Sequence, residues 1–149
     1  MRPIAHILKL VALAVAFTCV FDTHSTGAAD ESFKVIVNPE NPITAVSRTF
    51  LRDAYLKRAA DWGHGTTVRP VDLSRPSSVR ERFTHEVLRK SPSQLKNYWN
   101  QQIFSGKGVP PPAATSPMGV IEYVMDHPGA IGYLPSSVDP GSAKVILVR

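Results

Sequence analysis

The chain has 149 residues, with 17 Lys and Arg against 12 Asp and Glu, which gives a net charge of +5. This length accommodates one domain, and the basic residues are spread along the chain rather than gathered in a run with aromatic residues, so nucleic acid is not expected as a partner. The one cysteine, Cys19, excludes a disulfide within the chain.

The N-terminal segment has the pattern of a secretory signal peptide. Two basic residues precede the apolar run of residues 10–21, and the small residues at 26–29 suit cleavage by a signal peptidase. We therefore expect residues 1–29 to be removed on export to a bacterial periplasm and residues 30–149 to form the domain, with no stable membrane insertion afterwards. An uncleaved anchor is the alternative, although the apolar run is short for a bilayer. Removal takes away two cations and one anion, and so lowers the net charge to +4.

Hydrophobic periodicity and capping residues predict alternating strands and helices along the rest of the chain. Each helix is expected to begin at a serine whose hydroxyl accepts a hydrogen bond from an amide of the first turn. The expected elements are strand 33–38, a helix from Ser47, strand 66–72, a helix from Ser77 or Ser78 to about Lys90, helices from Ser91 and from Ser116, and strands 130–134 and 144–148. Such alternation is typical of an α/β fold in which helices flank a mostly parallel or mixed sheet.

Apolar stripes on the helices indicate which side chains form the core. The expected buried faces are Leu95, Tyr98, Trp99, Ile103 and Phe104 on one helix, and Met118, Ile121, Val124 and Met125 on the last one. Trp62, like Trp99, is expected to pack in the core rather than to form a ligand platform. Residues 106–112 are rich in Gly and Pro and predict an exposed loop without regular structure.

Two glycines mark the passage from the last helix into strand 130–134. Gly129 follows Pro128, and Gly132 lies inside the strand, where glycine is tolerated mainly if other atoms must come close. The pattern therefore predicts a tight helix-to-strand passage at 128–133.

The start of the helix at Ser77 is the candidate site for an anion. The first turn of a helix has amides without intrahelical acceptors and is the positive end of the helix dipole. Ser77 and Ser78 add hydroxyl groups, and Val79 completes the turn. Arg75 and Arg80 on either side can supply positive charge or bidentate hydrogen bonds to an oxyanion. An ordinary N-cap that binds nothing is the alternative.

Catalytic and metal-binding patterns are missing from the sequence. His64, His85 and His127 are isolated and lack metal-ligand spacing. Neither a nucleophile elbow nor a phosphate-cradling glycine-rich lysine loop occurs. We therefore expect no enzyme activity, no cofactor and no metal site.

From about Ser47 to its end, the chain resembles the periplasmic phosphate-binding proteins of ABC transporters. The resemblance is carried by residues 51–57 with Trp62, by residues 73–79 with Phe83, and by Pro-Gly-Ala-Ile-Gly-Tyr at 128–133. The segment 103–110 also resembles the short stand-alone relatives of that family. This resemblance implies an α/β fold that corresponds to a single lobe of a type II periplasmic binding protein.

The resemblance also implies a function. In the family, a Ser-Gly-Thr turn and the Arg and Asp before it contact phosphate, and these positions fall on Ser77, Ser78 and Val79, with Leu73 and Arg75 at the two charged positions. It implies a periplasmic solute-binding protein that takes inorganic phosphate or a related oxyanion and serves an ABC permease or an envelope sensor.

Departures from the family's pattern leave a second function open. Leu73 lacks a guanidinium, Val79 lacks a hydroxyl, and Arg75 stands where the family has a carboxylate. A chain with one lobe also leaves an anion largely hydrated, which weakens its electrostatic attraction. The alternative is a degenerate lobe that acts as a non-catalytic interaction module of the cell envelope, with residues 106–112 as its docking surface.

Overall fold

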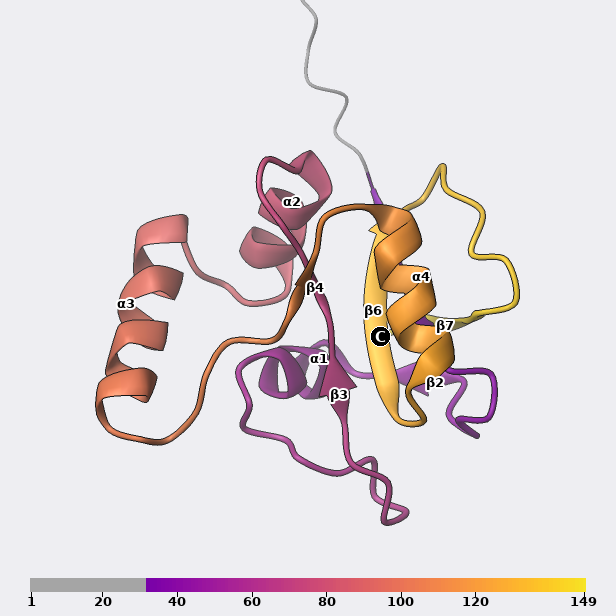
Figure 1. Ribbon diagram of the computed structural model, residues 1–149, viewed down its shortest axis with the longest axis horizontal. Coiled ribbons are helices and arrows are strands. Elements are labelled where there is room, and N and C mark those ends of the chain that lie inside the picture. The colour runs from indigo at the N-terminus through magenta and orange to yellow at the C-terminus, as the bar shows by residue number, and fades with distance from the viewer. Residues whose placement is uncertain (1–31) are drawn as a thin grey trace, which may run out of the picture.

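The computed structural model of the protein describes residues 32–149, so the expected signal peptide at 1–29 lies outside the described residues. Figure 1 shows strands in the middle of the molecule, with α2 and α3 on one side and α4 on the other. The elements are β1 (Phe33–Val37), β2 (Ala45–Val46), α1 (Arg48–Tyr55), β3 (Arg69–Pro70), β4 (Asp72–Leu73), α2 (Ser78–Glu86), α3 (Pro92–Phe104), β5 (Ala113–Ala114), α4 (Pro117–Asp126), β6 (Ala130–Pro135) and β7 (Lys144–Val148).

Five of the strands form one mixed sheet in the order β2-β7-β1-β6-β3, and β4 pairs with β5 separately. β1 is antiparallel to β6 and β7, whereas the pairs β2–β7, β3–β6 and β4–β5 are parallel. In the register of the central strands, Val35 lies opposite Tyr133 of β6 and Ile146 of β7. The edge strands β2 and β3 are two residues long. The predicted α/β fold with a mixed sheet and flanking helices is confirmed.

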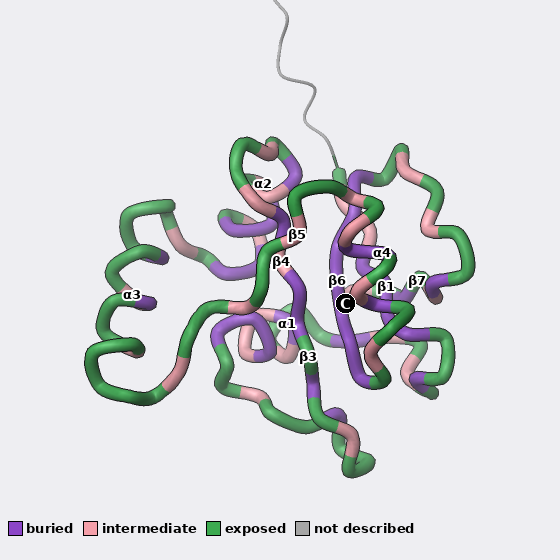
Figure 2. The backbone as a smooth tube through the Cα atoms, in the orientation of Figure 1, coloured by how far each residue is buried: buried purple, intermediate pink, exposed green. Residues whose placement is uncertain are grey.

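β6 lies between the central strand β1 and the edge strand β3, and every one of its residues is buried (Figure 2). Gly132 faces α4 so closely that a Cβ atom there would lie 2.5 Å from Val120 Cγ1. Gly129, just before the strand, has a φ of +82°, and a Cβ atom there would collide with the carbonyl of Thr67. The predicted tight passage at 128–133 is therefore confirmed.

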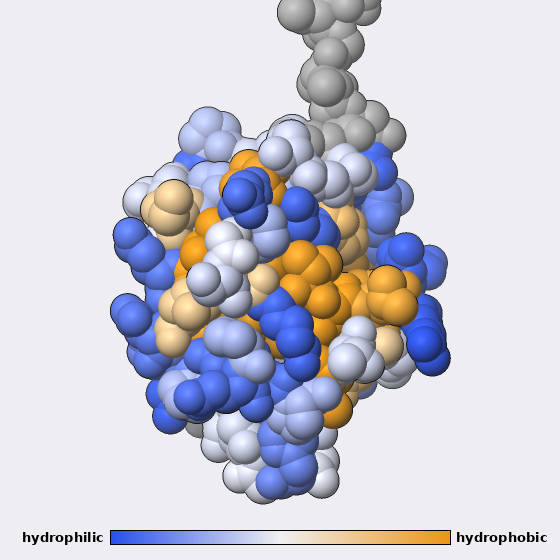
Figure 3. Space-filling view, turned by 90° about the vertical axis from the view of Figure 1, so that its right-hand side faces the viewer, coloured by the Kyte–Doolittle hydropathy of each residue, from blue (hydrophilic) through white to orange (hydrophobic). Residues whose placement is uncertain are grey.

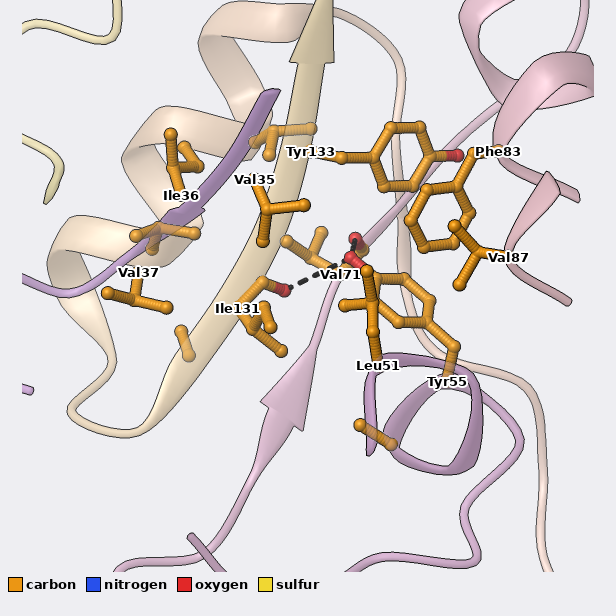
Figure 4. Packing of buried hydrophobic residues seen from close by; sticks show 14 of the residues in the cluster. Val35, Ile36, Val37, Leu51, Tyr55, Val71, Phe83, Val87, Ile131 and Tyr133 are labelled. Atoms are coloured by element: carbon orange, nitrogen blue, oxygen red, sulfur yellow. Dashed lines mark hydrogen bonds between the residues drawn. The ribbon is translucent and has the colours of Figure 1, made fainter. Parts of the chain in front are cut away.

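The other face of the sheet packs on aromatic side chains from α1 and α2 (Figure 4). Phe83 of α2 stacks on Tyr133 with ring centroids 4.0 Å apart, and Tyr55 of α1 lies 4.7 Å from Phe83. The Tyr55 hydroxyl donates to the carbonyls of Val71 (2.9 Å) and Ile131 (3.3 Å). These contacts tie α1 and α2 to the middle of the sheet.

Serine caps start each of the four helices within residues 32–149, as predicted. Ser47, Ser77, Ser91 and Ser116 each accept a hydrogen bond from the amide three residues ahead. Ser91 forms a capping box with Gln94, whose side-chain oxygen accepts from the Ser91 amide at 2.8 Å. Trp62 and Trp99 are buried, as expected.

Strand 66–72 was predicted as one element, and this prediction is wrong. The structure has two short strands, β3 and β4, with Val71 between them. The amide of Val71 still donates to Ile131 of β6, but the next amide, that of Asp72, donates to Pro112 at the start of β5. The chain therefore changes partners within this segment, and a pattern of apolar residues does not reveal such a change.

Two expected core faces extend less far than predicted. Ile103 and Phe104 at the end of α3 are exposed, Phe104 to 89%, while Leu95 and Trp99 are buried. On α4 the buried face consists of Val120, Ile121 and Val124, whereas Met118 is 60% exposed and Met125 is also exposed. In both cases the apolar stripe of the helix continues past the segment that packs on the core.

The side of the molecule that carries α4 and β7 has an apolar surface at its centre (Figure 3). Val145 and Leu147 of β7 are among the exposed apolar side chains. None of the helices within residues 32–149 is long and apolar enough to cross a membrane.

Candidate anion-binding site

The predicted turn at the start of α2 is present, and its residues differ in access to solvent. Ser77 is the N-cap, and its Oγ accepts from the amide of Arg80 at 3.1 Å. Ser78 is exposed, whereas Val79 is only 1% exposed and packs in the core. The side chain of Val79 therefore anchors the turn to the core, and the polar side chains of the turn belong to its neighbours.

Arg80 points away from bulk solvent and is held by a carboxylate. Its Nε and Nη2 donate to Oδ2 of Asp72 at 3.0 and 2.8 Å, and both side chains are 17% exposed. Burial alone would lower the pKa of Arg80, but the hydrogen bond and the charge of Asp72 outweigh it and raise that pKa. Arg80 thus keeps its charge and a fixed orientation.

Asp72 joins this arginine to the core of the protein. Its Oδ1 accepts from the hydroxyl of Tyr133 on β6 and from the amide of Leu73 at 2.8 Å. Burial and the nearby charge of Asp72 raise the pKa of Tyr133 far above its usual value, so the phenol stays protonated and remains a donor. The result is a connected line of polar groups from β6 through Asp72 to Arg80.

Arg75 is exposed, and it has no ion-pair or hydrogen-bond partner among residues 32–149. Together with Arg80 it lines two adjoining hollows. One, of about 560 Å³, is also lined by Asp72, Ser74, Pro92, Ser93, Leu95, Lys96, Trp99, Pro110, Pro111 and Ala113. The other, of about 330 Å³, is also lined by Glu81, Thr84, His85, Lys90, Ser91 and Pro92.

The structure thus brings together the two predicted arginines, whereas Ser77 and Ser78 line neither hollow. Sequence reasoning missed Asp72 and Lys96 as parts of the site. The signal for Asp72 was a carboxylate at the end of a strand, eight residues before Arg80. Lys96 lies on a different helix, and no local pattern in the sequence connects it with α2.

The charges of the larger hollow suit a negatively charged group. Arg75 and Lys96 bring cations without a partner in the described part of the chain, and Arg80 adds a third that is already paired. No group of three or more His, Cys, Asp or Glu among residues 32–149 is arranged to hold a metal ion. The cations of the hollow offer hydrogen bonding and charge attraction to an anion.

The sequence matches no protein-family model and no curated protein. Solved structures do match it. An ABC-type phosphate transport receptor from Vibrio cholerae is 20% identical with a TM-score of 0.62, and the match covers 79% of this chain and 46% of the receptor. PstS from Borrelia burgdorferi is 16% identical with a TM-score of 0.60 and coverages of 80% and 47%.

A protein from Clostridium perfringens whose structure holds bound phosphate is 17% identical with a TM-score of 0.59, and the match covers 79% of this chain and 45% of that one. The chain therefore spans less than half the length of these neighbours. At this level of identity the likeness concerns the fold, and the resemblance that the sequence suggested is confirmed at that level: the chain has the fold of about one half of a phosphate-transport substrate-binding protein.

Proposed function

We propose that this protein is a non-catalytic solute-binding lobe of the bacterial periplasm that holds phosphate or a related oxyanion beside the start of α2 and presents it to an ABC transporter or an envelope sensor. The observation that supports this most is Arg75, a cation without a partner among the described residues, on the wall of a hollow that Arg80 also lines. The fold shared with phosphate-transport proteins supports the choice of anion.

Each residue of the proposed site has a distinct role. Arg75 offers a free planar guanidinium, which suits bidentate binding of an oxyanion. Arg80 contributes charge from a fixed position. Ser77 and Ser78 lie at the positive end of α2, next to the hollows rather than on their walls, and Ser77 caps the helix. Val79 holds the turn in place through its buried side chain.

The proposed affinity is modest, for two reasons. The hollow is open to solvent on a single lobe, so water screens the attraction between charges. Asp72 also neutralises part of the charge of Arg80. We expect dissociation constants nearer the millimolar than the nanomolar range.

Calorimetric titration with phosphate, sulfate and a neutral sugar tests this proposal. We expect saturable binding of one or both anions and none of the sugar. Ser78→Asp and Arg75→Ala should weaken it about tenfold or more. Arg69→Ala is the matched control, because it removes an exposed arginine that lines neither hollow. Flat isotherms at millimolar anion would end the proposal.

A second candidate function is an interaction module of the envelope. It is favoured by the exposed Phe104 and Val109, which flank or lie within the loop of residues 106–112. In this case a partner protein should co-purify from envelope extracts, and shortening the loop should release it. The loss of phosphate binding with Arg75→Ala would not affect that partner.

A further inference from the structure

We propose that the hollow of about 560 Å³ lined by Arg75 and Arg80 takes an oxyanion that carries an apolar ring or chain, such as a phosphate monoester, rather than free phosphate alone. This inference rests on the proposed function, because it names the class of ligand that the same site takes.

The hollow has two unlike walls. One is cationic, with Arg75 and Lys96 unpaired among residues 32–149 and Arg80 held by Asp72. The other is apolar and consists of Leu95 and Trp99 of α3 with Pro110 and Pro111 of the following loop. A bare tetrahedral anion satisfies the first wall only. The apolar wall would then stay in contact with water, which is unfavourable.

The size of the hollow leads to the same class of ligand. Its volume of about 560 Å³ lies within the range of sites for small organic molecules, roughly 300–1,000 Å³, and such sites combine apolar walls with a few polar groups. Phosphate is much smaller than such a molecule. A phosphate monoester fills both parts at once, with its anionic group at the arginines and its apolar group along Trp99 and the prolines.

The apolar wall is fixed in place before any ligand arrives. The amide of Asp72 donates to the carbonyl of Pro112 at 2.9 Å, and that of Ser74 donates to Ala114 at 2.8 Å, so the end of the proline segment is clamped to the strand that carries Asp72. Leu95 and Trp99 are themselves buried residues of the core, so their positions are fixed by packing. A wall that is already ordered costs little conformational entropy when a ligand binds.

Another hollow of the described chain is larger but lacks this combination. It has a volume of about 670 Å³ and is lined by Arg48, His85, Glu86, Arg89, Lys90, Ser91 and Gln94. Two of these, Arg48 and Glu86, approach within 3.8 Å of one another. Without an apolar wall it gives no reason to favour an organic anion.

The test compares phenyl phosphate, inorganic phosphate and phenol by calorimetry and by tryptophan fluorescence. We expect phenyl phosphate to bind about tenfold more tightly than phosphate. This factor corresponds to about 1.4 kcal/mol, which needs only about 60 Å² of buried apolar surface. Binding should also change the emission of Trp99, and Trp99→Phe should abolish that change.

Two further variants separate the walls. Ala113→Phe fills the apolar side from an exposed position of β5, so it should weaken the binding of phenyl phosphate more than that of phosphate and remove the tenfold preference. Val145→Phe places the same side chain at an exposed position on β7 that does not line the hollow, and should have no effect. Thermal unfolding of each variant checks that it is folded.

The outcomes are distinct. Equal affinities for phosphate and phenyl phosphate, or a preference that survives Ala113→Phe, would overturn this inference and leave the proposed function intact. Phenol binding as tightly as phenyl phosphate would also overturn it, because the anionic group would then contribute nothing. If neither anion binds at millimolar concentration, the proposed function fails as well.

Discussion

Gly132 is the position where a single methyl group should disturb this fold most clearly. It lies in the middle of β6 and faces α4. A Cβ atom at Gly132 would be 2.5 Å from Val120 Cγ1, 3.1 Å from Val71 Cγ1 and 3.2 Å from Val124 Cγ2. Carbon atoms in contact are normally about 3.5–4.0 Å apart. All three valines are buried, so they have little room to move away.

The expected cost of Gly132→Ala follows from these contacts. Overpacking a core typically costs about 1–3 kcal/mol, and with three buried neighbours we place this case in the upper half of that range. Alanine also has less conformational entropy than glycine in the unfolded chain, which stabilises the folded protein by about 0.5–1 kcal/mol and offsets part of this cost. The net loss in the free energy of unfolding is therefore about 2 kcal/mol, or a fall of about 8 °C in Tm.

Urea unfolding followed by circular dichroism measures this change. Gly119→Ala is the matched control on α4, since its Cβ would lie 3.3 Å from Ala114 Cβ; we expect a change of less than about 1 kcal/mol. Val120→Ala makes room for the new methyl group, so Gly132→Ala with Val120→Ala should lose at least about 1 kcal/mol less than the sum of the two single changes. Additive losses, or a Gly132→Ala protein within about 0.5 kcal/mol of the wild type, would refute the packing argument.

Three further results are expected. Burial is the main cause that raises the pKa values of Tyr55 and Tyr133. Their contribution to stability is therefore complete below pH 10 and is lost above it, because the unfolded chain then loses these protons first, by up to about 1.4 kcal/mol per pH unit for each tyrosine. Urea unfolding between pH 9 and 11.5 should show this slope, and Tyr55→Phe should halve it. Asp72→Asn should lower the free energy of unfolding by about 2 kcal/mol, because a half-buried pair with Arg80 is broken, yet it should strengthen phosphate binding in calorimetry. Ser91→Ala removes a capping box and should cost about 1 kcal/mol, seen as a Tm lower by about 4 °C. A flat alkaline profile, weaker phosphate binding in Asp72→Asn, or an unchanged Tm in Ser91→Ala would each contradict the corresponding prediction.

Local patterns in the sequence were enough to predict most of the elements and the fold class. The serine caps at Ser47, Ser77, Ser91 and Ser116 mark the helix starts because capping depends on residues only three positions apart. The two glycines of 128–133 predicted close packing because few other reasons favour glycine inside a buried strand.

The parts that could not be predicted depend on contacts between distant segments. The division of strand 66–72 arises because the amide of Asp72 donates to the carbonyl of Pro112, forty residues further along the chain. The exposure of Phe104 depends on where the core ends, not on the periodicity of its helix. The same holds for the site, since Arg75 and Arg80 were found from one segment, but Lys96 and Trp99 of α3 join them only in the folded protein, where they line the same hollow.

The short strands at the two margins of the main sheet have a consequence for solubility. A long unpaired margin is a template to which another chain can add by backbone hydrogen bonding, and this is a common route to aggregation. Here the outer strands offer two residues each, and one of the two in β3 is Pro70, which has no amide hydrogen to donate. The protein thus leaves little backbone on which a neighbouring molecule could extend the sheet, which suits a domain whose core strands are strongly apolar.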